Sequence, residues 1–443
     1  MQVGQRLYQQ AKRLIPGATQ LFGKRPELYA PDQWPPYYAT ALGCQVTDLD
    51  GNTYVDMSTG GIGATVLGYS DPDVTHAVID AIQRGSMCSL NPAQEVELVQ
   101  LLIDIHPWAQ MARLGRMGGE SMAMAIRIAR ARTQRDKVAF CGYHGWHDWY
   151  LAANLSVSGD DTVNDRLADY HLMAGLDPAG IPKKLAGTAI PFGYNKIDEL
   201  KTIVDREGQH LAAIVMEPTR SDEPAPGFLE SVRDLANRSG ARLVFDEITI
   251  GWKLCLGGSH LKYGVEPDIA VFAKSTGNGH PIAAVLGNAD TMQAAQNTFI
   301  SSALWTEAVG PAAGIAAINK FKRVDVPKHI DRIGRAVRDG LAELATENNL
   351  PLSFSAHPAL TQYRFDHPHQ AAIQTLWTVR MLERGFLTAG LFCPMLSHES
   401  SHVSAFLNAC EPVFFEISQA IKDQSLEQRI GGPVKHTGFT RLA

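Results

Sequence analysis

The sequence has no long apolar run, no closely spaced pair of cysteines and no block of basic residues. No stretch approaches the roughly 20 apolar residues of a membrane-spanning helix. The N-terminal residues alternate polar and apolar groups, unlike the apolar core of a signal peptide. The six cysteines are scattered without a Cys-x-x-Cys pair or another metal-ligand spacing. From these absences we expect the cysteines to serve as small core residues. We also expect the protein to lie in the reduced cytoplasmic compartment and to have no membrane partner.

Positive charge is also scarce. The chain of 443 residues has 40 lysines and arginines against 46 acids, and its net charge is −6. Phosphate contacts need clustered basic residues, so we expect no nucleic-acid partner. Hydrophobic residues make up 45% of the chain and charged residues 19%, which excludes a disordered chain and predicts a large packed core.

The order of patterns along the chain predicts a central α/β domain. Residues 4–14 form an amphipathic helical pattern, and residues 45–56 alternate around a turn signal, as in a β-hairpin. From about residue 70 to 300, helical patterns alternate with short apolar runs at 138–141, 211–216, 241–245, 269–272 and 282–286. Such runs are typical of strands buried on both faces and joined by crossover helices. Beyond Pro311, long helices at 312–322 and 330–348 and then mixed segments predict a smaller α+β unit.

Two of the apolar runs lead into side chains that can carry chemistry. Asp246 ends one run, which places its carboxylate at the sheet edge where open α/β sheets bind ligands; the ordinary alternative is an acid that caps the next helix. Lys274 ends another run. Burying its charge is costly, whereas a lysine in a Schiff base takes part in covalent chemistry. Their separation, 274 − 246 = 28 residues, is about one strand–helix–strand crossover, so the two side chains can lie side by side.

Two further segments add a phosphate turn and an aromatic ring. Gly118 and Gly119 open a helical pattern, where free N–H groups and the helix dipole favour an anion, although such a pair is also an ordinary helix start. Tyr143 follows a predicted strand and can serve as a platform for a ring. The nearby His144 and His147 lack the spacing and the third ligand of a metal site, so we expect no metal. A phosphate cradle, an aromatic ring, a carboxylate and a lysine are what pyridoxal 5′-phosphate (PLP) requires.

With these motifs, the sequence resembles the class III aminotransferases of PLP fold type I, most closely glutamate-1-semialdehyde 2,1-aminomutase and related aminotransferases. The likeness extends from Pro16-Gly17 through 48–52 to the segments around Asp246 and Lys274. It implies an α/β fold with a large domain, whose mostly parallel seven-stranded sheet has helices on both faces, and a small α+β domain built from both chain ends. The expected divisions are 1–65, 66–310 and 311–443. The resemblance also implies a homodimer whose active sites are shared between subunits.

The resemblance assigns roles position by position. It identifies Lys274 as the Schiff-base lysine, Asp246 as the acid on the pyridine nitrogen, Tyr143 as the stacking ring, Ile248 as the residue on the opposite ring face, and Gly118 with Gly119 as the phosphate turn. The family's Ser-Gly-Thr is replaced here by Met-Gly-Gly, which removes a phosphate hydroxyl that Ser121 could replace. The threonine that a neighbouring subunit usually contributes aligns with Ala303, so Ser301 or Ser302 is left to donate, and we assign Ser302.

The substrate-binding arginines of the family have no clear counterpart. Lys24 and Arg25 lie near the position of the aminomutase arginine but also fit a solvated face, and Arg220 is either a carboxylate ligand or a surface residue. The predicted function is PLP-dependent transfer of an amino group from an amino-acid donor to a carbonyl acceptor, such as a keto sugar or semialdehyde, through pyridoxamine phosphate. The alternatives are intramolecular transfer, as in the aminomutase, and a non-catalytic binding protein of the same fold.

Overall fold

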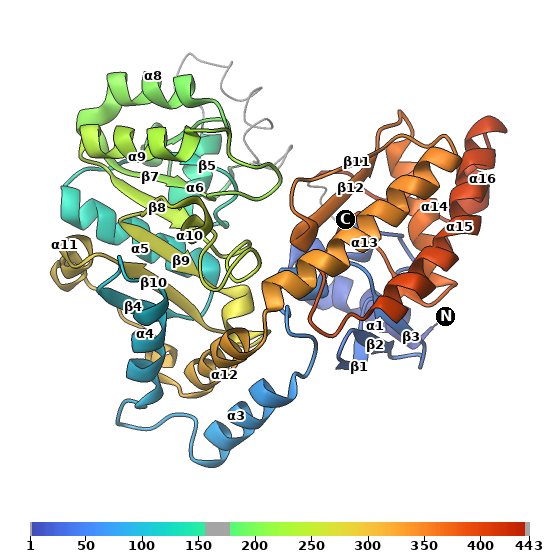
Figure 1. Ribbon diagram of the computed structural model, residues 1–443, viewed down its shortest axis with the longest axis horizontal. Helices are drawn as coiled ribbons and strands as arrows, with labels where there is room; N and C mark the ends of the chain where they lie inside the picture. Colours follow the sequence, from blue (N-terminus) through green and yellow to red (C-terminus); the bar gives the residue numbers. More distant parts are fainter. Residues whose placement is uncertain (1, 156–177, 439–443) are drawn as a thin grey trace. The chain divides into compact units, whose positions relative to one another are not determined.

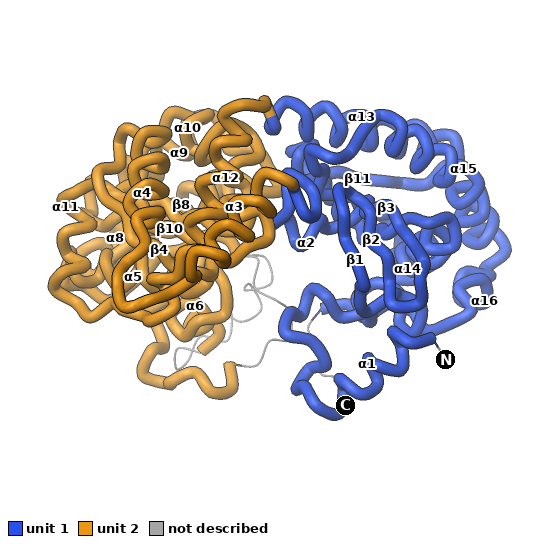
Figure 2. The backbone as a smooth tube through the Cα atoms, turned by 90° about the horizontal axis from the view of Figure 1, so that it is seen from below, with its two compact units in different colours: residues 1–71, 326–443 blue, residues 72–325 orange. Residues whose placement is uncertain are grey.

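The computed structural model describes residues 2–155 and 178–438. The chain forms two compact units, one of residues 72–325 and one of residues 1–71 with 326–443 (Figure 2). The second boundary therefore lies at 325, not at the expected 310. The reason is helix α12 (Val309–Arg323), whose buried face packs against α3 (Pro72–Gln83) and α4 (Gln94–Ile105) of the larger unit. No helix of the described ranges is long and apolar enough to cross a membrane.

A seven-stranded sheet forms the centre of the larger unit (Figure 1). Its strands, in spatial order, are β4 (Met111–Gly115), β10 (Ala283–Gly287), β9 (Ile269–Phe272), β8 (Arg242–Asp246), β7 (Leu211–Met216), β5 (Lys137–Cys141) and β6 (Ala189–Pro191). β10 is antiparallel to both of its neighbours, β4 and β9, and the other six strands all run in the same direction. The predicted α/β class and mostly parallel sheet are confirmed.

Helices cover both faces of this sheet, which explains why its strands are continuously apolar. Val138 and Phe140 of β5 face the core formed with α5 (Gly118–Thr133), whereas Ala139 and Cys141 face the core formed with α8 (Ile197–Glu207) and α9 (Phe228–Ser239). Since successive side chains of a strand point to opposite faces, both sets must be apolar. The shorter helices of the unit are α6 (Asp148–Leu151), α10 (His260–Tyr263) and α11 (Ala289–Met292).

The register of the parallel strands brings their carboxyl ends to one edge. Cys141 of β5 lies opposite Met216 of β7, and Met216 lies opposite Phe245 of β8. Asp246 in turn lies opposite Val271 of β9. The segments that follow β5, β7, β8 and β9 therefore begin side by side at the edge where open α/β sheets bind ligands.

The smaller unit combines two small sheets with helices from both chain ends. One sheet has the order β1 (Tyr38–Leu42), β2 (Gln45–Asp48), β3 (Thr53–Asp56) and β13 (Phe386–Leu387), and the other has β11 (Leu352–Phe354), β12 (Thr361–Phe365) and β14 (Leu391–Phe392). The helices are α1 (Val3–Leu14), α2 (Gly60–Gly63), α13 (Val326–Glu347), α14 (Gln370–Leu382), α15 (Ser400–Lys422) and α16 (Leu426–Ile430). The predicted hairpin is β2–β3, and Gly51 supplies the positive φ of 85° that its turn requires.

Candidate active site

Asp246 is held at the end of β8 by bonds to both of its carboxylate oxygens. It is 3% exposed. Its Oδ1 accepts the N–H of Ile248 at 3.0 Å, and its Oδ2 lies 2.8 Å from Nδ1 of the buried His144. The other ring nitrogen of His144 lies 3.0 Å from the carbonyl oxygen of Cys141. His144 therefore joins the carboxylate of Asp246 to the end of β5.

Lys274 begins the short 3₁₀ helix η7 (Lys274–Gly277) just beyond β9. Its φ is 49°, in the left-handed region that residues other than glycine rarely adopt and that often marks functional sites. Its Nζ donates to Oγ1 of Thr249 at 3.0 Å. Thr249 stands three residues after Asp246, so the segment that follows β8 supplies both the acid and the partner of the lysine amine.

A second, buried lysine contacts the segments that carry Thr249 and Lys274. Lys253 is 1% exposed, and its Nζ donates to the carbonyl oxygen of Thr249 at 2.7 Å and to Oγ of Ser275 at 2.8 Å. It thereby links the residue that bonds Lys274 to the residue that follows Lys274. Neither Lys253 nor Thr249 was expected from the sequence, because nothing in the pattern distinguishes Lys253 from a surface lysine.

The Gly118-Gly119 turn packs tightly against the segment after β8. A Cβ at Gly118 would lie 2.8 Å from Cδ1 of Ile248, and one at Gly119 would lie 3.0 Å from the ring of His147. A side chain at either position would therefore force the turn or its neighbour to move. Glu120 fixes the turn by accepting the N–H of Met117 at 2.9 Å. No residue of the described part of the chain bonds the N–H groups of Gly118 and Gly119, which are the anion-binding donors of a helix start.

The hydroxyl candidates for the phosphate differ in exposure. Ser121 is fully buried, and its Oγ would lie 2.6 Å from a Cβ at Gly115, so this hydroxyl faces the interior below the turn. Ser301 and Ser302 are exposed, in the segment that leads into η9 (Ala303–Thr306). Within the same chain this segment lies beside the turn, since Nε1 of Trp305 donates to Glu120 at 3.2 Å.

Tyr143 stands two residues after β5 and is 40% exposed, so part of this residue is open to a ligand. The edge of the ring meets Tyr150 at a centroid distance of 6.0 Å. Desolvation raises the pKa of Tyr143, and its hydroxyl is therefore neutral at physiological pH.

The neighbouring strand, β7, leads into an ion pair. Glu217 is the first residue after β7 and is 5% exposed. Nη1 of Arg220 lies 3.2 Å from its Oε2, and this carboxylate raises the pKa of Arg220. Arg220 therefore lies at the same sheet edge as Tyr143 and Asp246.

Lys24 and Arg25 belong to the other unit. Of the two histidines considered as metal ligands, His144 contacts Asp246, and the ring of His147 packs beside Gly119. Across residues 2–155 and 178–438, no group of three or more histidines, cysteines or acids could hold a metal ion.

The residues present fit PLP. The cofactor supplies an aldehyde for a lysine and a pyridinium ring that takes up electrons. The buried carboxyl group of Asp246 fits the pyridinium nitrogen, and Ile248 and Tyr143 offer an apolar side chain and an aromatic ring for its two faces. The Gly118 turn, with its unbonded N–H groups, fits the phosphate.

Comparison with known proteins places the chain in a family. The family model of class-III aminotransferases matches residues 29–411, so the chain belongs to the class-III aminotransferases, which are PLP-dependent enzymes. It is 32% identical to 3-aminobutyryl-CoA aminotransferase of Cloacimonas acidaminovorans (81% of this chain, 82% of the relative) and 30% identical to 2'-deamino-2'-hydroxyneamine transaminase of Streptomyces kanamyceticus (82% and 87%). Glutamate-1-semialdehyde 2,1-aminomutases are also among its relatives. The PLP-bound FumI protein of Sphingopyxis sp. MTA144 shares the fold, with a TM-score of 0.84, 22% identity and coverage of 95% of this chain and 97% of that chain.

Proposed function

We propose that the chain transfers an amino group from an amino-acid donor to a carbonyl acceptor, with Lys274 and Asp246 at the reacting centre. The observation that carries this proposal is the placement of Asp246 and Lys274 at the ends of adjacent parallel strands, linked through Thr249. A side chain that forms the covalent link and one that stabilises the cationic ring are the two groups that PLP chemistry takes from the protein.

In this proposal each residue has a distinct task. Lys274 would hold the cofactor through its aldehyde, and its amine, when free, would move the proton at the substrate carbon. Thr249 keeps that amine in place through its hydroxyl. Asp246, fixed by His144, keeps the ring nitrogen protonated. Gly118, Gly119 and the partner subunit's loop around Ser302 bind the phosphate.

The relatives favour an acceptor with a carbonyl on a polar carbon skeleton. The Streptomyces kanamyceticus relative is named as a transaminase of 2'-deamino-2'-hydroxyneamine, and we take this name as support for a keto sugar. The second candidate is an aminomutase, favoured by the relatives of that name, in which one molecule is both donor and acceptor. A donor requirement separates the two, because an aminomutase turns over without an added amino acid.

The test is a half-reaction screen of the PLP-loaded protein. Amino acids are added singly while the absorbance band of the bound cofactor is followed. The resulting amino form is then mixed with keto sugars and semialdehydes. Loss of the band with a donor and its return with an acceptor support the proposal. A protein whose band no amine changes would refute it, and turnover of a semialdehyde without a donor would favour the aminomutase.

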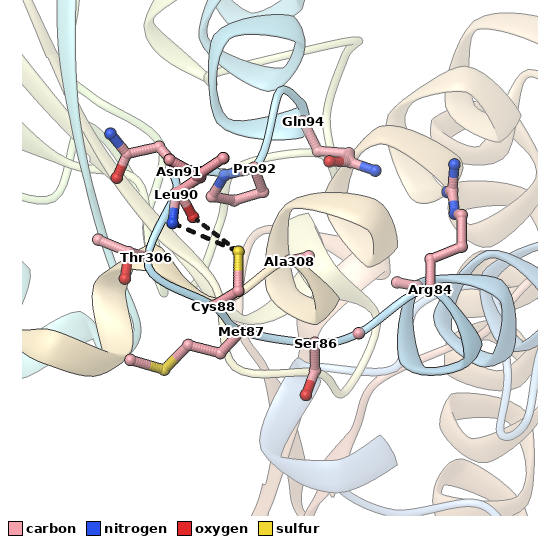
Figure 3. A pocket seen from close by; sticks show the side chains of 12 residues that line it. Arg84, Ser86, Met87, Cys88, Leu90, Asn91, Pro92, Gln94, Thr306 and Ala308 are labelled. Carbon is pink, nitrogen blue, oxygen red and sulfur yellow. Dashed lines mark hydrogen bonds between the residues drawn. The ribbon is translucent and has the colours of Figure 1, made fainter.

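We also propose that the chain is a homodimer with shared active sites. Residues 84–91, between α3 and α4, are all exposed, including Met87 (47%) and Leu90 (77%), and Phe299 is 84% exposed. Figure 3 shows the hollow that this loop lines with Thr306 and Ala308. Apolar side chains so exposed are typical of a surface that a second copy covers. Sedimentation equilibrium is expected to give a dimer that Leu90→Asp weakens, whereas a fully active monomer would contradict the proposal.

A cytoplasmic location is a further part of the proposal, supported by six cysteines that are all free thiols.

A further inference from the structure

Lys253 contacts both ends of the arrangement that holds Lys274. Its Nζ donates to Oγ of Ser275, the residue that follows Lys274, at 2.8 Å. The same Nζ donates to the carbonyl oxygen of Thr249 at 2.7 Å, and Oγ1 of Thr249 accepts the amine of Lys274 at 3.0 Å. Lys253 therefore fixes both the backbone from which the Lys274 side chain starts and the residue that its amine bonds.

The backbone at Lys274 needs such support. Its φ of 49° lies in the left-handed region, and a residue other than glycine stays there only where its surroundings enforce it. Trp252 adds a second constraint, since its Nε1 donates to Oγ1 of Thr276 at 2.9 Å. That hydroxyl in turn donates to the carbonyl oxygen of Ala273 at 3.0 Å. Trp252 and its neighbour thus hold the two residues after Lys274, both of which are fully buried.

The charge of Lys253 is a cost that packing alone does not require. The residue is 1% exposed, and taking an ammonium group out of water is unfavourable. Methionine has a similar length without the charge, and apolar replacements of buried charged groups are often neutral or stabilising. The two hydrogen bonds of its Nζ are therefore what distinguishes Lys253 from an apolar core residue.

We propose that Lys253 is a positioning residue for Lys274, a role that rests on the proposed function of this site. It acts through Ser275 and Thr249, which hold the Lys274 amine in place before the cofactor binds. The covalent link joins Nζ of Lys274 to the aldehyde carbon and releases the aldehyde oxygen as water. Without Lys253, this link must itself impose the strained backbone, and part of its free energy is lost.

The competing explanation is structural. Lys253 could serve only to pack the segment after β8, which also carries Asp246 and Ile248. Loss of Lys253 would then disturb all contacts of that segment, including those proposed for the cofactor ring. A cofactor that forms the covalent link and one that cannot would be weakened alike, whereas a positioning role affects only the first.

The experiment therefore uses two forms of the cofactor. PLP and pyridoxamine 5′-phosphate are titrated into the cofactor-free protein, and calorimetry measures both dissociation constants. Pyridoxamine 5′-phosphate has the same ring and phosphate but an amine in place of the aldehyde, so it forms no link to a lysine. The proteins compared are the wild type, Lys253→Met, Ser275→Ala, Lys274→Ala and, as a control, Lys201→Met. Lys201 is a surface lysine of the same unit, and its Nζ bonds Asp198 at 2.9 Å.

We expect Lys253→Met to raise the dissociation constant of PLP by at least about fivefold, the order that the strain at Lys274 implies, and to leave that of pyridoxamine 5′-phosphate unchanged. Ser275→Ala should show a smaller loss of the same kind, Lys274→Ala the largest, and Lys201→Met none.

Equal weakening of both cofactor forms by Lys253→Met, or unchanged binding of PLP, would overturn the proposal for Lys253. Should Lys253→Met not fold, Ser275→Ala decides by the same criterion. A wild type that does not bind PLP, or whose PLP binding is not weakened in Lys274→Ala, would instead refute the proposed function.

Discussion

Substituting Gly118 by alanine tests whether the turn at the start of α5 and Ile248 form one binding surface. The new Cβ would lie 2.8 Å from Cδ1 and 3.1 Å from Cγ2 of Ile248, so the turn or the isoleucine must move. Overpacking of this kind costs about 1–3 kcal/mol. Because Cδ1 is the movable end of its side chain, the lower part of that range applies, about 1–2 kcal/mol. Whichever side yields, one proposed cofactor contact is displaced, and the dissociation constant of PLP should rise about 5- to 30-fold.

The assay is a titration of the cofactor-free protein with PLP, followed by absorbance. Gly118→Ala should bind weakly, and Gly118→Ala/Ile248→Val should recover most of the affinity, since valine lacks the Cδ1 atom at 2.8 Å. Gly208→Ala is the matched control, because the nearest atom to its new Cβ is 3.5 Å away. Wild-type affinity of Gly118→Ala, or a second substitution that brings no recovery, would refute the reasoning.

Two further predictions concern stability. Burial lowers the pKa of His106 from 6.5 to about 4, and the neutral ring, which bonds the carbonyl of Leu102 and the N–H of Gly258, is the folded form. The unfolded state therefore binds more protons than the folded state below pH 6.5. The two pKa values differ by about 2.5 units, and each unit corresponds to 1.36 kcal/mol. The free energy of unfolding should therefore fall by about 3 kcal/mol between pH 6.5 and pH 4. Denaturant titrations across this range should show a smaller loss in His106→Gln, and identical pH profiles would contradict the assignment. Arg116→Met should cost about 3 kcal/mol, because it removes the cation whose Nε lies 2.8 Å from Oε1 of Glu307, and with it the donor to the carbonyl oxygens of Gly115, Trp305 and Glu307. Calorimetry should find part of that loss recovered when Glu307→Gln is added, and no recovery would mean that the ion pair does not contribute.

The sheet could be predicted because its strands are buried on both faces. The apolar runs at 138–141, 211–216 and 269–272 fall within β5, β7 and β9 almost residue for residue. The side chains at their carboxyl ends could be predicted for the same reason, since parallel neighbours end at one edge. The second domain boundary could not be predicted from the sequence, because the helical pattern after Pro311 does not show which unit the helix packs against.

The contacts around the site depend on loops that meet only in the folded chain. The spacing of His144 and His147 suggested at most a weak metal site, whereas the structure uses His144 to hold Asp246. The fit of Gly118 against Ile248 joins segments 130 residues apart in sequence (248 − 118), and no local pattern reports it. Lys253 was missed because a buried lysine resembles an exposed one in sequence. The roles at the cofactor of all the assigned residues stay predictions: Lys274, Asp246, Gly118, Gly119, Tyr143, Ile248 and Ser302.

The most direct test of the central claim is to locate the covalent attachment of PLP. The PLP-loaded protein is reduced with borohydride, digested and mapped by mass spectrometry, which fixes the cofactor on the lysine that held it. We predict a single pyridoxyl group on Lys274, and none in Lys274→Ala. Attachment to the neighbouring Lys253, or to no lysine at all, would contradict the account.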